Sequence, residues 1–128
     1  MSILTIDDFQ EERDLLFTIL NSAGFGPLLP VGTAREGLHL LGVGKRGKQT
    51  SGIDLVLMDI MMPEMDGLTA MRAIRERPEW HKLPIIALTA KAMKNDQEQA
   101  LAAGANDYMA KPLDVDQLLS LVRVWMPR

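Results

Sequence analysis

The sequence predicts an α/β fold in which parallel strands alternate with helices in a doubly wound sheet. Along the 128 residues, five short apolar runs alternate with five segments of helical periodicity. This alternation is typical of βαβ units, whose crossover helices cover both faces of a parallel sheet. The first and third runs are almost continuously apolar, as strands buried on both faces are. We therefore expect one domain over residues 1–128, a (βα)5 fold with strand order 2-1-3-4-5.

Each apolar run has the length of a buried strand. The runs are Ile3 to Ile6, Leu28 to Val31, Asp54 to Met58, Ile85 to Leu88 and Asp107 to Ala110. Residues suited to phosphate or metal chemistry follow four of them, namely Asp7 and Asp8, Asp59, Thr89, and Lys111. Because the carboxyl ends of parallel strands share one edge of the sheet, we expect these residues to converge there.

The first helix is predicted from apolar spacing over Glu11 to Ala23, and it ends at Gly24. Its expected buried face consists of Leu15, Leu16, Ile19, Leu20 and Ala23. The segment from Gly42 to Gly52 is glycine-rich and basic, so it is the longest predicted loop.

Capping side chains indicate where the other four helices begin: Thr33, Asp66, Asn95 and Asp114. Asn95 with Glu98, and Asp114 with Gln117, have the spacing of a capping box. Pro78 ends the third helix, and Pro127 follows the last one.

Composition excludes several classes of function. The chain has no cysteine, which rules out disulfides, thiolate catalysis and cysteine-ligated metals. No apolar run approaches the roughly 20 residues that a membrane span needs. A net charge of -3 with mixed signs argues against a nucleic-acid surface. We expect a cytoplasmic protein without membrane or nucleic-acid contact, as a monomer or weak dimer.

Carboxylates gathered at one strand edge repel one another, so either their pKa values are raised or a cation lies among them. Magnesium is the simpler answer, because it takes oxygen ligands, with Asp8 and Asp59 binding directly and Asp7 through water. With the charge screened in this way, Asp59 can act as a nucleophile toward phosphorus. Lys111 and Thr89 supply the ammonium and hydroxyl that phosphoryl transfer requires.

The same residues lie in longer motifs. These are Asp7-Asp8, the stretch from Asp59 through Pro63 to Gly67, Leu88-Thr89-Ala90, and the stretch from Tyr108 to Pro112. With these motifs the chain resembles, along essentially its whole length, the response-regulator receiver domain of two-component signalling. The resemblance implies a flavodoxin-like fold and a function in phosphorelay signal transduction.

The resemblance also implies roles for individual residues. Asp59 would be the phosphoacceptor. Asp8, Asp59 and the main-chain carbonyl of Met61 would bind Mg2+, with Asp7 orienting a metal-bound water. The domain would catalyse only its own phosphorylation and dephosphorylation, which is not the activity of an ordinary enzyme.

The remaining roles concern the switch to the active state. Thr89 and Lys111 would contact the phosphoryl group, and the peptide bond before Pro112 would be cis. Tyr108 would turn from exposed to buried as the Thr89 hydroxyl moves inward beside the small Ala90. The affected surface would be the fourth helix, the fifth strand and the fifth helix.

The resemblance implies a partner that carries a phosphohistidine, either a histidine kinase or a histidine phosphotransfer protein. Two stretches, Met62 to Gly67 and Ala90 to Leu113, are most similar to receivers of hybrid sensor histidine kinases. A stand-alone regulator and a domain of a hybrid kinase both stay open.

Two alternative functions remain. An aspartate-nucleophile phosphohydrolase of the haloacid dehalogenase type would also use a strand edge with magnesium, but it needs a second aspartate two residues after the nucleophile, where this chain has Met61. The other alternative is a binding module with this fold that is never phosphorylated. The complete set of acids, threonine and lysine argues against it.

Overall fold

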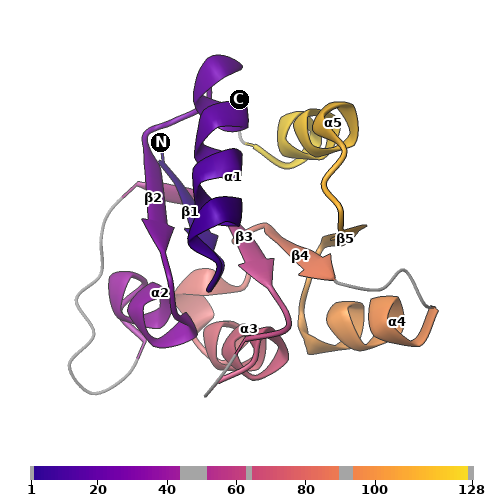
Figure 1. Ribbon diagram of the computed structural model, residues 1–128. Helices are drawn as coiled ribbons and strands as arrows, with labels where there is room; N and C mark the ends of the chain where they lie inside the picture. Colours follow the sequence, from indigo (N-terminus) through magenta and orange to yellow (C-terminus); the bar gives the residue numbers. More distant parts are fainter. Residues whose placement is uncertain (1, 44–51, 63–64, 90–93, 127–128) are drawn as a thin grey trace.

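The computed structural model describes residues 2–43, 52–62, 65–89 and 94–126, without the side chains of 94–96. Its five strands are all parallel and lie in the order β2-β1-β3-β4-β5 (Figure 1). The strands are β1 (Ser2–Ile6), β2 (Leu28–Val31), β3 (Ile53–Asp59), β4 (Ile85–Thr89) and β5 (Asp107–Ala110). The predicted fold and strand order are confirmed.

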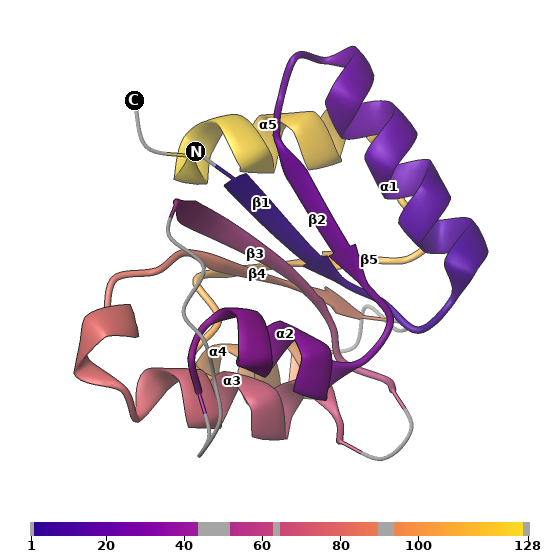
Figure 2. The same ribbon diagram turned by 90° about the vertical axis from the view of Figure 1, so that its left-hand side faces the viewer.

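Helices cover both faces of this sheet. They are α1 (Gln10–Ser22), α2 (Ala34–Leu40), α3 (Gly67–Arg75), α4 (Lys94–Ala103) and α5 (Val115–Trp125), with a 3-10 turn, η1 (Pro78–Trp80), after α3. Figure 2 shows α1 and α5 on one face and α2, α3 and α4 on the other. None of the helices in the described ranges is both long and apolar enough to cross a bilayer.

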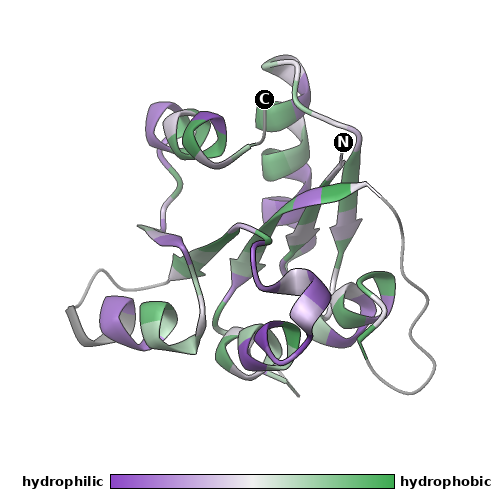
Figure 3. Cartoon of the chain, turned by 180° about the vertical axis from the view of Figure 1, so that it is seen from behind, coloured by the Kyte–Doolittle hydropathy of each residue, from purple (hydrophilic) through white to green (hydrophobic). Residues whose placement is uncertain are grey.

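Two apolar cores lie on the two faces of the sheet. One contains Leu16 and Leu20 of α1 with residues of α5, and the other contains Met71 and Ile74 of α3 with residues of α2 and α4. Successive strand residues enter opposite cores, because side chains alternate across a strand. In Figure 3 the strands are mainly hydrophobic, whereas the helices carry hydrophilic residues on their outer sides. Burial of each large apolar side chain contributes about 1.5–3 kcal/mol to folding.

The predicted buried face of α1 is partly wrong. Leu16 and Leu20 are fully buried and Ile19 is half-buried, but Leu15 is 47% exposed and Ala23 is exposed after the helix end. Apolar spacing alone predicted a wider stripe than the helix uses, because α1 contacts the molecule on one side only. Residues four apart on that side, Leu16 and Leu20, carry the packing.

Three of the four predicted helix caps are confirmed. The side chains of Thr33, Asp66 and Asp114 each accept a hydrogen bond from the backbone N–H three residues later, at 2.8 to 3.1 Å. The prediction for Asn95 is wrong, since α4 already includes Lys94 and Asn95 therefore lies inside the helix. A short polar residue is also common in a first turn, so the motif alone did not fix the first residue. Pro127 and most of the predicted loop, residues 44–51, lie outside the described residues.

The two tryptophans lie at the amino edge of the sheet, opposite the strand ends considered below. Trp80 donates its indole N–H to the carbonyl of Leu41 at 2.8 Å, and Trp125 donates to Asp107 Oδ2 at 3.1 Å. Both line a cavity of about 270 Å³ beside the starts of β3 and β4. The indoles therefore connect α2 to η1 and α5 to β5.

Arg75, at the end of α3, connects three segments. Its guanidinium donates to the carbonyl of Trp80 at 2.6 Å, to the carbonyl of Gly104 at 2.9 and 3.0 Å, and to Asn106 Oδ1 at 2.8 Å. Asn106 Oδ1 also accepts the backbone N–H of Ile85 at 2.9 Å. Arg75 thereby fixes the loop that leads into β5 relative to α3 and β4.

Substituting Arg75 with methionine should lower the free energy of unfolding by about 2–3 kcal/mol, because several partly buried acceptors lose a charged donor. Arg72 lies exposed on the same helix, so Arg72→Met should cost less than about 0.5 kcal/mol. Urea unfolding of the two variants measures the difference. Equal losses would show that the Arg75 hydrogen bonds contribute little.

Candidate functional site

Strand register brings the predicted site residues to one edge of the sheet. Ile6 pairs with Met58, so Asp7 and Asp59 follow neighbouring positions of β1 and β3. Thr89, the last residue of β4, pairs with Ala110, the residue before Lys111. The Lys111 N–H also donates to the Thr89 carbonyl at 2.7 Å.

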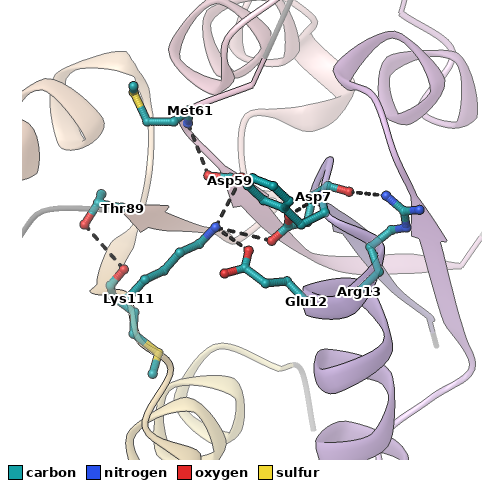
Figure 4. Close-up of polar contacts among 9 residues, drawn as sticks. Asp7, Glu12, Arg13, Asp59, Met61, Thr89 and Lys111 are labelled. Atoms are coloured by element: carbon teal, nitrogen blue, oxygen red, sulfur yellow. Dashed lines mark hydrogen bonds and ion pairs between the residues drawn. The ribbon is translucent and has the colours of Figure 1, made fainter.

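At this edge, the Lys111 ammonium lies among three carboxylates. Its Nζ is 3.2 Å from Asp59 Oδ2, 3.4 Å from Asp7 Oδ2 and 2.5 Å from Glu12 Oε2 (Figure 4). Oxygens of the three acids lie within 4.8 Å of one another. Asp7 is 0% and Asp59 1% exposed, so both carboxylates are held away from bulk water.

Backbone groups fix the orientation of these acids. Asp7 Oδ1 accepts the N–H of Phe9 at 3.0 Å, and Asp59 Oδ1 accepts the N–H of Met61 at 3.2 Å. The Arg13 guanidinium donates to the Asp7 carbonyl at 2.7 Å. One oxygen of each aspartate is therefore held by the chain, and the other faces the ammonium.

Burial dominates the protonation of the aspartates. It raises the pKa of Asp7 to about 7, together with the hydrogen bond to Glu12 and against the opposing effects of the Phe9 N–H and Lys111. Burial also raises the pKa of Asp59, and the nearby Lys111 charge only partly offsets it. A buried carboxylate is costly to ionise, because water no longer solvates the charge.

The pKa values of Glu12 and Lys111 shift in the directions that favour the charged forms of both side chains. Burial by itself raises the pKa of Glu12, but its hydrogen bonds with Asp7 and Lys111 hold it below the ordinary value. Burial by itself lowers the pKa of Lys111, but Glu12, Asp59 and Asp7 raise it above the ordinary value. The two groups form an ion pair at the rim of the site.

The donor set fits a hard divalent cation. In the described part of the chain, Asp8 Oδ1 and Asp59 Oδ2 are buried oxygens that accept no hydrogen bond. Among the described residues, the ion-pair partner of Asp59 Oδ2 is the Lys111 ammonium at 3.2 Å. A buried polar atom without a partner costs free energy, and magnesium prefers carboxylate oxygens. The acids at this edge could therefore hold Mg2+.

The structure brings Asp7, Asp59 and Lys111 into contact, and it places other predicted residues nearby. Thr89 is buried, and its hydroxyl donates to the Met109 carbonyl at 3.5 Å, toward β5. The Met61 side chain is 69% exposed, while its N–H points at Asp59.

Of the predicted switch and proline residues, Tyr108 lies in β5 and Pro112 lies just after it. Tyr108 is half-buried against the core that α2, α3 and α4 cover. The Lys111-Pro112 peptide bond is cis, as is Gly26-Pro27. Ala90 and Pro63 lie outside the described residues.

Sequence reasoning missed Glu12 and Arg13. Both lie near the start of α1. Arg13 donates to the Asp7 carbonyl, and Glu12 accepts from the Lys111 ammonium. The available signal was the position of both residues in the first residues of the predicted helix, a few residues after the Asp7-Asp8 pair.

The Asp66-Gly67 pair closes the loop that follows Asp59. Asp66 caps α3, and Gly67 donates its N–H to the Ile60 carbonyl at 2.9 Å. A Cβ at Gly67 would lie 2.4 Å from the Asp59 carbonyl oxygen, so only glycine fits against the strand end. The motif thus holds the loop against the backbone of Asp59.

Comparison with known proteins identifies this arrangement. The family model of the response regulator receiver domain matches residues 3–123. The chain belongs to this family. It is a receiver domain of two-component phosphorelay systems, which the predicted resemblance implied.

Its relatives include small proteins and large kinases. The chain is 39% identical over 123 residues to an uncharacterized 14.6 kDa protein of Leptolyngbya boryana, covering 96% of this chain and 88% of that one. It is 37% identical over 126 residues to the sensor histidine kinase GacS of Pseudomonas protegens, of which it spans only 13%.

A solved structure supports the same family assignment. The signal receiver domain of a signal transduction histidine kinase from Syntrophus aciditrophicus is 29% identical, with a TM-score of 0.82 over 97% of this chain and 88% of that one.

The raised pKa of Asp7 predicts how the stability of the metal-free protein depends on pH. Its contribution is fully present below about pH 4 and is lost as the pH rises through about 7, because only the unfolded carboxyl ionises easily in that window. Asp59 shifts in the same direction. Urea unfolding with a chelator, at pH 5.5 and pH 8, should show lower stability at pH 8. Asp7→Asn should flatten this dependence, and an unchanged slope in the variant would contradict the assignment.

Proposed function

We propose that this receiver domain accepts a phosphoryl group from a phosphohistidine onto Asp59. The observation that carries the proposal is a buried carboxylate, 1% exposed, whose Oδ2 accepts no hydrogen bond and lies 3.2 Å from the Lys111 ammonium. Such an oxygen is free to act as a nucleophile, and a positive charge stands where phosphoryl oxygens would come.

In the proposed reaction, Asp59 Oδ2 forms a bond to phosphorus as the phosphorus–nitrogen bond of the partner's imidazole breaks. The electron pair of that bond stays on the imidazole nitrogen. The Asp59 Oδ1 atom remains on the Met61 N–H, which holds the carboxylate in line during the attack. Lys111 then moves from the acids to the phosphoryl oxygens and neutralises their charge.

Magnesium fits the same site. The proposed ligands are Asp8, Asp59 and the main-chain carbonyl of Met61, with Asp7 acting through water. When bound, the ion supplies positive charge to the transferring phosphoryl group and screens the clustered carboxylates. Loss of the phosphoryl group to water would use the same residues, so the domain would catalyse only its own modification.

Phosphorylation is proposed to shift the domain between two packings. The Thr89 hydroxyl makes a long hydrogen bond of 3.5 Å to Met109, which a phosphoryl oxygen can replace. Tyr108 is half-buried and would pack more deeply once Thr89 turns. The surface formed by α4, β5 and α5 would then change its shape for a partner.

The proposed partner is a histidine kinase or a histidine phosphotransfer protein. Similarity to a segment of larger kinases supports a hybrid-kinase context, and similarity to most of a 14.6 kDa protein supports a stand-alone regulator. We further propose that the domain acts in the cytoplasm, without direct contact to nucleic acid or membrane, as a monomer or weak dimer.

Asp59→Asn should abolish labelling by acetyl phosphate with magnesium, because an amide cannot form the acyl phosphate. Intact-mass measurement detects the added phosphoryl group, and circular dichroism checks the fold. Asp116→Asn, on the exposed side of α5, should label like the wild type. Continued labelling of the Asp59 variant would refute the assignment, and turnover of a small phosphomonoester would favour a phosphohydrolase.

A further inference from the structure

Glu12 is the nearest partner of the Lys111 ammonium. Glu12 Oε2 lies 2.5 Å from Nζ, compared with 3.2 Å for Asp59 Oδ2 and 3.4 Å for Asp7 Oδ2. Glu12 comes from the first turn of α1 and Lys111 is the residue after β5, and Figure 4 shows the Lys111 ammonium reaching the Glu12 carboxylate. The ion pair therefore joins two elements that lie 99 residues apart in the chain.

The ammonium and a divalent cation compete for the same oxygens. Asp59 Oδ2 faces the ammonium and is also an oxygen that a metal would use. A positive charge at this distance repels a second cation unless an anion neutralises it. Glu12 is well placed to do so, because it contacts the ammonium at the half-buried rim of the site, whereas Asp7 and Asp59 lie deeper.

We propose that Glu12 is a positioning residue that draws the Lys111 ammonium toward α1 and so weakens its competition with magnesium for Asp59. This inference rests on the proposed function of the same site. Glu12 acts through Lys111 and is not itself a ligand of the metal. When a phosphoryl group reaches Asp59, its oxygens attract the ammonium more strongly than Glu12 does, and Lys111 moves to them.

The test begins with magnesium binding, measured by titration calorimetry without any phosphodonor. Glu12→Gln keeps the size of the side chain and removes its charge, so Lys111 should pair more closely with Asp59, and the dissociation constant for magnesium should rise about three- to tenfold. Glu11→Gln removes the same charge from the neighbouring, exposed position of the same turn. This matched control should change the constant by less than about twofold.

A double-substitution cycle with Lys111→Met shows whether Glu12 acts through the lysine. Without the ammonium there is nothing for Glu12 to hold, so adding Glu12→Gln should change magnesium binding by less than about twofold. An equal loss in both backgrounds would show that Glu12 binds the metal directly and would overturn the proposal. A Glu12→Gln protein that binds magnesium as tightly as Glu11→Gln would overturn it too.

Labelling by acetyl phosphate supplies an independent readout. At saturating magnesium, Glu12→Gln should label at least as fast as the wild type, because the phosphoryl group no longer competes with Glu12 for Lys111. A general structural defect would slow labelling at every magnesium concentration, and that result would contradict the proposal.

Glu12→Ala, checked for folding by circular dichroism, should reproduce the weaker magnesium binding. A wild type that never labels would refute the proposed function, whereas the magnesium cycle would still decide the role of Glu12.

Discussion

Negative charge crowded at one edge of the sheet is the constraint on which the rest of the site depends. Three carboxylates have oxygens within 4.8 Å of one another, and two of them are almost completely buried. Such an arrangement is stable only if protons or cations compensate it. In this structure Lys111 compensates part of the charge, and the raised pKa of Asp7 shows that burial outweighs that compensation. The unfavourable crowding of these charges would favour a metal ion at this edge.

The scaffold holds this charge with ordinary packing. Parallel register sets the ends of β1, β3, β4 and β5 side by side, and two apolar cores on the faces of the sheet offset the cost of burying the acids. Local hydrogen bonds then fix the details, from the N–H groups that orient Asp7 and Asp59 to the loop closed by Gly67. The hydrogen bonds of Arg75 to Gly104 and Asn106 fix the loop that leads into β5. This helps to position β5 and therefore Lys111, which follows it. Chemistry at one edge is thus supported by contacts spread over the whole domain.

The sequence was sufficient to predict the fold and the convergence of Asp7, Asp59 and Lys111. Apolar runs separated by helical periodicity leave few other topologies, and the ends of parallel strands must share an edge. The direction of a side chain at the end of a strand was not predictable in the same way. Thr89 was expected to face the acids, yet its hydroxyl donates to Met109, because rotamers depend on the neighbours that a strand acquires only on folding.

The contacts of long side chains on helices were also not predicted from the sequence. Glu12 reaches the site because α1 starts directly beside Asp7, and Arg75 reaches Gly104 across the space between α3 and α4. Both contacts depend on how a helix is rotated about its axis, which apolar spacing gives only approximately, as the exposed Leu15 demonstrates. The residues of these two polar contacts are separated by 29 and 99 positions, so no local sequence pattern indicates that they meet.

The indole of Trp125 gives the chain a built-in optical probe. Its hydrogen bond to Asp107 ties the end of α5 to the residue directly before Tyr108. A rearrangement of that tyrosine would therefore alter the surroundings of this indole through a single peptide link. Trp80 is anchored on Leu41 and lines the same cavity as Trp125, so its emission would overlap that of Trp125. Substituting Trp80 with phenylalanine would leave Trp125 as the single tryptophan. Its emission wavelength would then report on the start of β5 without any attached dye.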